Sequence, residues 1–113
     1  MKKNIIIITG GAGFVGTNLI KFFLKNTKYK MISIDNYSSG LKINHIKDKR
    51  IKYIKDDTKN IFNILKNYNT INSIFHFGEF SRIYQSFIKM NECINSNSIG
   101  SNAVFNYCLK YKI

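Results

Sequence analysis

The chain has 113 residues, 44% of them hydrophobic and none of them proline, which suits one compact domain over residues 1–113 and excludes wholesale disorder. Its formal net charge of +12 would suit a nucleic-acid binder. The lysines are scattered, however, and only two basic residues are the arginines that phosphate and base recognition favour, so we expect no nucleic-acid partner.

The first predicted elements are a strand over residues 4–9 and a helix over residues 14–25. The strand is a run of β-branched isoleucines that ends at glycine, and the helix shows apolar residues at helical spacing. Between them lies a loop with two overlapping glycine templates. Gly11, Gly13 and Gly16 fit G-x-G-x-x-G, whereas Gly10, Gly13 and Gly16 fit T-G-x-x-G-x-x-G.

A strand that leads through a glycine turn into a helix places backbone N–H groups and the positive end of the helix dipole at one point, which attracts phosphate. The early glycines allow close approach of a pyrophosphate, and Gly16 lets the helix pack against the strand. A P-loop is excluded, because no Gly-Lys-Ser/Thr follows the glycines. A glycine-rich connection without a ligand is the alternative interpretation.

The second predicted strand, residues 30–35, ends at Asp35, nineteen residues after Gly16. A carboxylate at this place can accept hydrogen bonds from the ribose hydroxyls of an adenosine and would repel a 2′-phosphate. The spacing therefore favours NAD over NADP, with an ordinary aspartate at a strand end as the alternative.

The remaining elements continue the alternation of strands and helices. We predict an irregular helical turn within residues 41–48, strands over residues 51–55 and 71–77, a helix from Thr58 to about Asn67 that Thr58 could cap, and a last helix over about residues 91–110. Alternating elements imply the α/β class, as a parallel Rossmann-type doubly wound sheet of about four strands, of which only the N-terminal half is present.

The two cysteines, Cys93 and Cys108, would lie about 22 Å apart on that last helix, which excludes a disulfide between them. Reduced thiols and the lack of a signal peptide favour the cytoplasm, and the longest apolar run, residues 5–8, is too short to span a bilayer. We therefore expect neither a membrane partner nor a secreted protein.

Five segments together resemble the extended short-chain dehydrogenase/reductases, and within them the NAD-dependent sugar-nucleotide epimerases and dehydratases, of which UDP-glucose 4-epimerase is a familiar member. In chain order these segments are TGGAGFVG, DNYSSG, DDT, IFHFGE and NSIG. The resemblance implies bound NAD and, in a complete enzyme, a nucleotide-sugar substrate that is transiently oxidised by hydride transfer to NAD.

The resemblance also implies which residues bind the cofactor. They are Phe14 and Val15 over the pyrophosphate; Asp35 and Asn36 at the adenosine ribose, with Ser39 and Gly40 beside them; Asp57 and Thr58 flanking the adenine; Phe77, Gly78 and Glu79 along the ribose and phosphates; Ser81, where galactose epimerases usually carry lysine; and Asn97 near the nicotinamide-side ribose. For Thr58 helix capping is an equal alternative, and for Asn97 plain solvent exposure is one. His76 is more typical of a buried strand end than of a catalytic base.

Two departures from the family pattern limit this assignment. Gly78-Glu79 stands where two small residues are usual, so Glu79, Ser81 and Arg82 leave the sugar open. The family's Tyr-x-x-x-Lys pair is absent, since no tyrosine has a lysine four residues later. We assign no catalytic residue and no metal ligand, and we expect no catalysis by this chain alone.

Two functions remain open at this point. The chain is either the NAD-binding N-terminal part of a nucleotide-sugar epimerase or dehydratase, or a stand-alone dinucleotide-binding module. The fourth strand would form an exposed apolar edge, so we expect self-association, and the resemblance implies a homodimer through the last helix.

Overall fold

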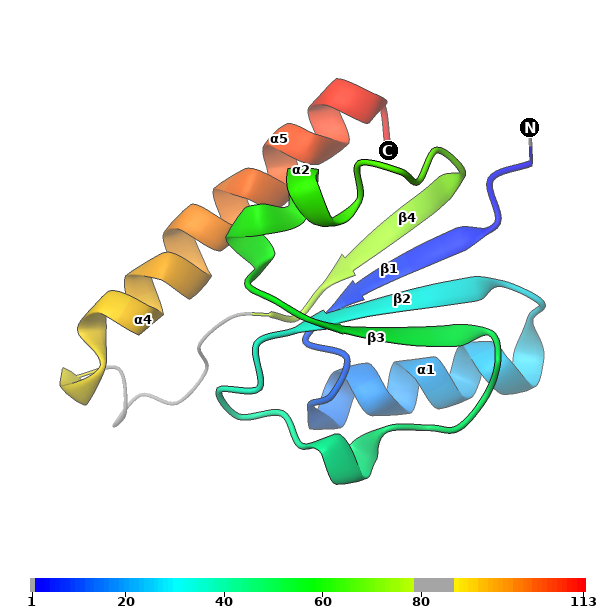
Figure 1. Cartoon of the computed structure of the whole chain (residues 1–113), viewed down its shortest axis with the longest axis horizontal. Coiled ribbons are helices and arrows are strands. Elements are labelled where there is room, and N and C mark those ends of the chain that lie inside the picture. The colour runs from blue at the N-terminus through cyan, green and yellow to red at the C-terminus, as the bar shows by residue number, and fades with distance from the viewer. Residues whose placement is uncertain (1, 79–86) are drawn as a thin grey trace.

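A computed structural model describes residues 2–78 and 87–113 of the chain. Four strands form one parallel sheet in the order β3-β2-β1-β4, namely β1 (Ile5–Thr9), β2 (Lys30–Asp35), β3 (Ile51–Lys55) and β4 (Ile71–His76). The α/β class and the parallel sheet are confirmed (Figure 1). The second and third strands have the predicted bounds, and the first and fourth are each one residue shorter.

The register of the sheet places three strand ends side by side. Thr9 of β1 is paired with Ile34 of β2 and with His76 of β4. Helix α1 (Phe14–Asn26) begins beside these strand ends, as Figure 1 shows. The predicted phosphate-binding loop therefore lies at the carboxyl edge of the sheet, where ligands bind in open α/β folds.

The four consecutive isoleucines of β1 divide between two hydrophobic cores. Ile6 and Ile8 pack on the α1 side, where the core is completed by Ile20, Met31 and Ile51. Ile7 packs on the opposite side, with Ile32, Ile34, Ile61, Leu65, Ile71, Val104 and Tyr107. Helices thus cover both faces of the sheet, which explains why β1 shows no polar alternation.

The second predicted helix is shorter than expected. Residues 58–67 form a 3₁₀ turn, η2 (Thr58–Asn60), and a single helical turn, α2 (Ile61–Ile64). The N-cap of η2 is Asp57, without a side-chain capping bond, so the prediction that Thr58 caps a long helix was wrong. This segment lacks a capping bond and an acidic first turn, and isoleucine and asparagine are weak helix formers.

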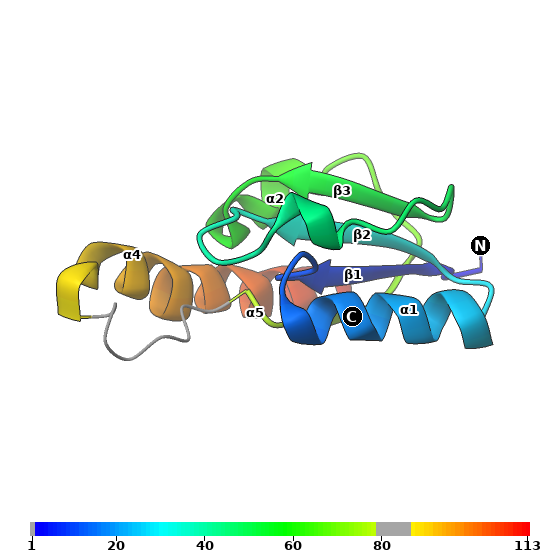
Figure 2. The same ribbon diagram turned by 90° about the horizontal axis from the view of Figure 1, so that it is seen from below.

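The last helix extends over the predicted range but is not uniform. It consists of α4 (Met90–Ile94), a π-helical segment η3 (Asn95–Gly100) and α5 (Ser101–Tyr111). In Figures 1 and 2 its first part extends past the ends of the strands. Cys93 and Cys108 on this helix are free thiols, and burial raises the pKa of Cys108. Among the described helices, none combines the length and the apolar character needed to cross a bilayer.

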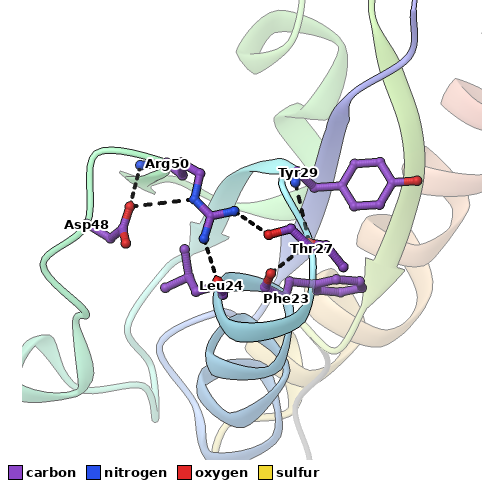
Figure 3. A network of polar contacts seen from close by, with 6 residues as sticks. All are labelled: Phe23, Leu24, Thr27, Tyr29, Asp48 and Arg50. Carbon is purple, nitrogen blue, oxygen red and sulfur yellow. Dashed lines mark hydrogen bonds and ion pairs between the residues drawn. The ribbon is translucent and has the colours of Figure 1, made fainter.

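Arg50, just before β3, fixes the far end of α1 (Figure 3). Its guanidinium donates to the carbonyl oxygens of Thr27, at 2.6 Å, and Leu24, at 2.5 Å, and Asp48 lies 3.9 Å from its Nε. The last carbonyls of a helix lack intrahelical partners, and a cation at this end also interacts favourably with the helix dipole. Arg50 therefore connects β3 to the helix whose other end forms the glycine loop.

We predict that Arg50→Ala lowers the free energy of unfolding by about 2 kcal/mol, because it removes two charged hydrogen bonds to backbone carbonyls. Arg50→Lys should recover only part of this loss, because one ammonium cannot reproduce the planar fork. Urea unfolding followed by circular dichroism measures both variants, with Lys49→Ala as the control. Equal stability of Arg50→Ala and Lys49→Ala would contradict the prediction.

Ser33 in β2 carries a buried hydroxyl for which the described part of the chain offers no hydrogen-bond partner. It packs against Gly11, where an added Cβ would lie 2.0 Å from the Ser33 Oγ. A buried hydroxyl without a partner is energetically costly, so the polarity of Ser33 does not explain why serine is present. Its small side chain does, because it lets Gly11 pack closely against β2.

We expect Ser33→Ala to leave the free energy of unfolding unchanged or to raise it by up to about 1 kcal/mol, because no hydrogen bond is lost. Thr17→Val is the contrasting control, since the buried Thr17 hydroxyl donates to the carbonyl of Gly11. Chemical unfolding compares the two variants. A larger loss for Ser33→Ala than for Thr17→Val would show that Ser33 has an energetic role as a donor or acceptor.

Candidate functional site

The turn after β1 requires glycine because of backbone packing. Gly10 has φ +75°, and a Cβ there would lie 2.8 Å from the backbone carbonyl carbon and oxygen of Phe77. A Cβ at Gly16 would lie 2.3 Å from the carbonyl oxygen of Gly10. The backbone geometry thus assigns the tight turn to Gly10 and the close contact between helix and turn to Gly16.

Gly13 differs from these two glycines, since its added Cβ would meet only the Gly10 carbonyl oxygen, at 3.4 Å. Gly13 is the N-cap of α1 and makes no side-chain capping bond. The first bond of the helix runs from the Thr17 N–H to the Gly13 carbonyl, so the amides of residues 14–16 lie in the helix's first turn, where N–H groups lack intrahelical acceptors. The protein's own packing leaves space over Gly13, next to these amides.

Asp35 lies at the centre of the site, with 8% of its surface exposed. Its Oδ2 accepts a hydrogen bond from the Ala12 amide at 3.0 Å, and its Oδ1 accepts one from the Tyr37 amide at 2.8 Å. A Cβ at Gly40 would lie 2.7 Å from Oδ2, so Gly40 allows its loop to approach the carboxylate. Each carboxylate oxygen can accept a second hydrogen bond, which leaves capacity for a ligand's hydroxyl groups.

The loop after β2 is fastened to the glycine turn. The Leu41 amide and the Asn44 side-chain amide both donate to the Ala12 carbonyl, at 3.2 and 2.8 Å. Tyr37, with φ +62°, bonds through its hydroxyl to His45 Nε2. Burial and the nearby Asp35 raise the pKa of Tyr37, which keeps this phenol neutral. The loop that carries Ser39 and Gly40 is therefore held against the predicted phosphate site.

Most of the predicted cofactor-binding residues line one groove of about 410 Å³ at the carboxyl edge of the sheet. These are Gly10, Gly13, Phe14, Val15, Gly16, Asp35, Asn36, Ser39, Gly40, Thr58, Phe77 and Gly78. Asp57 lines an adjoining groove of about 470 Å³, together with Lys55, Lys59 and Glu92. Asn36 lines both grooves, and its side-chain amide donates to Asp57 Oδ1 at 3.0 Å.

One described residue of the predicted set does not line either groove. Asn97 lies on the π-helical segment outside the lining of both grooves, and its amide contacts Cys93 Sγ at 3.6 Å. Glu79 and Ser81 lie outside the described residues. Their roles stay predictions.

The groove also contains residues that sequence reasoning missed. Ser96 lines both grooves, and its hydroxyl donates to the Gly78 carbonyl at 2.9 Å. His76 lines the main groove and is half-buried, although we expected a core residue. The π-helical segment fixes which side of the last helix faces β4. Ser96 could therefore be assigned to the groove only once this segment was known.

The groove offers the hydrogen-bond donors and the acceptor that a dinucleotide needs. Amides at a helix N-terminus suit an anionic phosphate, the open space over Gly13 allows close approach, and Asp35 keeps acceptor capacity in the same groove. Within residues 2–78 and 87–113, no group of three or more His, Cys, Asp or Glu residues could hold a metal ion.

Comparisons with known proteins agree with this geometry. ADP-L-glycero-D-manno-heptose-6-epimerase of Alkalilimnicola ehrlichii is 29% identical over 96% of this chain and 34% of its own length. UDP-N-acetylglucosamine 4-epimerase from Methanobrevibacter ruminantium, solved with UDP-N-acetylmuramic acid, has a TM-score of 0.83 at 25% identity over 100% of this chain and 36% of its own. The Bordetella bronchiseptica enzyme WbmF, solved with NAD⁺, has a TM-score of 0.85 at 20% identity over 95% of this chain and 32% of its own.

The chain thus spans about a third of the length of each of these relatives. Residues 6–113, nearly the whole sequence, match the family described as the NAD dependent epimerase/dehydratase family. Because this match covers nearly the whole sequence, the chain belongs to the NAD dependent epimerase/dehydratase family.

Proposed function

We propose that this chain binds NAD in the groove at the carboxyl edge of its sheet. The observation that carries the proposal is the open space over Gly13, beside the first amides of α1. The protein's own packing does not require glycine at this position, so close approach of a ligand is the better explanation for it. In this arrangement the amides of residues 14–16 hold the pyrophosphate, and Asp35 accepts hydrogen bonds from the adenosine ribose. Asn36 takes part in binding the ribose, and Asp57 and Thr58, which line the same pair of grooves, flank the adenine.

We further propose that the chain supplies the cofactor-binding part of a nucleotide-sugar epimerase or dehydratase. NAD, when bound, supplies a reversible hydride acceptor for the transient oxidation of the sugar. The residues of this chain bind and orient the cofactor. Proton transfer needs a base as well, and the Tyr-x-x-x-Lys pair of the family does not occur in this sequence. The substrate class is supported by relatives solved with UDP-glucose and with UDP-N-acetylmuramic acid.

The same absence of Tyr-x-x-x-Lys favours a second candidate, a dinucleotide-binding module without catalysis. Turnover of a nucleotide sugar by the purified chain would exclude that candidate. Self-association belongs to both proposals, because α5 exposes Phe105 and Leu109 and β4 lies at an edge of the sheet.

We predict that Gly13→Ala lowers NAD affinity at least tenfold and changes the free energy of unfolding by less than about 1 kcal/mol. The new Cβ would make only an ordinary contact within the protein but would project into the groove. Isothermal titration calorimetry with NAD and urea unfolding measure the two effects, with Asn26→Ala at the other end of α1 as the control. Unchanged NAD affinity in a folded Gly13→Ala variant, or no saturable binding by the wild type, would refute the proposal.

We also predict that the wild-type chain binds NAD at least tenfold more tightly than NADP, since the Asp35 carboxylate repels a 2′-phosphate. Asp35→Ala should reduce this ratio and also lower the melting temperature, because Asp35 accepts the Ala12 and Tyr37 amides. Parallel titrations with NAD and NADP give the ratio, with Asp48→Asn as a control for lost negative charge. Equal wild-type affinity for the two cofactors would contradict this role of Asp35.

A further inference from the structure

A chain of hydrogen bonds crosses the carboxyl edge of the sheet from the groove to the last helix. The Gly78 amide donates to Thr9 Oγ1 at 2.9 Å, and the same oxygen lies 2.6 Å from His76 Nδ1. The other ring nitrogen, Nε2, lies 2.8 Å from the Ser101 hydroxyl at the start of α5. This chain of bonds links β1, the end of β4 and α5.

The direction of these bonds follows from the burial of Thr9, which has no exposed surface. Its oxygen accepts from the Gly78 amide, so its own proton needs an acceptor, and His76 Nδ1 lies at the right distance. The hydrogen-bond network therefore assigns the neutral tautomer, in which Nδ1 accepts from Thr9 and Nε2–H donates to Ser101.

The chain of bonds ends on Gly78, which is held from two sides. Its amide is bound by Thr9, and its carbonyl accepts from Ser96 at 2.9 Å. A Cβ at Gly78 would lie 2.9 Å from Thr58 Oγ1, so this residue also packs tightly against η2. Gly78 lines both grooves, and its backbone position therefore shapes the wall that a bound dinucleotide would touch.

The π-helical segment makes this double attachment possible. In an α-helix, residues five positions apart, such as Ser96 and Ser101, point about 140° apart around the axis. The wider turn of η3, with hydrogen bonds from residue i to i+5, brings such residues toward one face. Both serines consequently reach the end of β4.

We propose that His76 is a positioning residue for dinucleotide binding. As the Nε2–H tautomer it orients the Thr9 hydroxyl, which in turn fixes the Gly78 wall of the groove. This inference deepens the proposed function and rests on it for the identity of the ligand. His76 acts through Thr9 and Gly78 and is assigned no contact with the reacting atoms.

The first experiment reads the hydrogen-bond chain without any ligand. In the full chain, nitrogen NMR of the His76 ring should show an unprotonated Nδ1 and a protonated Nε2. Hydrogen exchange of the Gly78 amide should be at least tenfold faster in Thr9→Val and in His76→Ala than in the wild type. In His76→Asn it should stay near the wild-type rate, because the asparagine oxygen can take the place of Nδ1 as the acceptor.

Thr27→Val is the matched control. The Thr27 hydroxyl also accepts from a backbone amide, that of Tyr29 at 3.3 Å, and donates to the Phe23 carbonyl at 2.7 Å. It lies at the opposite end of α1, about 20 Å along the helix axis from the glycine loop, and Figure 3 shows these contacts. This variant should leave Gly78 exchange unchanged.

The second experiment measures NAD affinity by calorimetry. His76→Ala should bind NAD about tenfold more weakly than the wild type. Without the His76 acceptor, the Gly78 backbone would occupy its binding-competent position for a smaller fraction of the time. His76→Asn should recover most of that affinity, and Thr27→Val should match the wild type.

The two experiments separate the two proposals. A wild type that does not bind NAD defeats the proposed function, while the ring tautomer and the Gly78 exchange still decide the role of His76. A protonated Nδ1, or Gly78 exchange unaffected by Thr9→Val, overturns that role whatever the NAD result. If His76→Ala does not fold, the wild-type spectrum, Thr9→Val and His76→Asn still give the answer.

Discussion

The site depends on close packing at three glycines, two of which lie against backbone atoms and one against a small side chain. Gly10 lies against the carbonyl of Phe77, Gly16 lies against the carbonyl of Gly10, and Gly11 lies against Ser33. Any Cβ at these positions would separate β1, β4 and α1 at the edge where they meet. Because the strands are parallel and their carboxyl ends are paired, this contact also brings Asp35 and Gly78 to the same groove.

Polar groups at this edge fall into two classes. Some already have partners within the fold, such as the Ala12 amide on Asp35 and the Gly78 amide on Thr9. Others, namely the first amides of α1 and the second acceptor positions of Asp35, remain available to a ligand. The first class holds the second in place, and such preorganisation lowers the free-energy cost of binding.

The sequence was most informative where a residue type has one strong physical meaning. The isoleucine run predicted a buried strand, and the glycine spacing together with Asp35 predicted a groove that most of the expected residues do line. It failed for the helix after Asp57, where weak helix formers yield a single turn that packing holds in place. It did not predict that Asp35 also accepts a hydrogen bond from the Ala12 amide, because a bond between segments far apart in the chain leaves no local pattern.

His76 and Ser96 show why part of the site could not be predicted. Their partners lie on other elements, and the phase of the last helix decides whether Ser96 faces β4 or solvent. That phase changes within residues 95–100, a segment predicted from the sequence to belong to one continuous helix. A periodicity argument assumes a constant angle per residue, and this helix does not keep one.

The π-helical segment has a consequence for how this helix can evolve. Hydrogen bonds from residue i to i+5 accommodate one more residue per turn than those of an α-helix, so the segment is equivalent to a one-residue insertion. Deleting one residue there would restore a regular helix and leave α4 in nearly its present orientation about the axis, because the wider turn already absorbs the extra residue. A one-residue change in length at this point would therefore leave the apolar side chains of α4 facing the same way, whereas a deletion within a regular α-helical stretch would rotate them by roughly 100°.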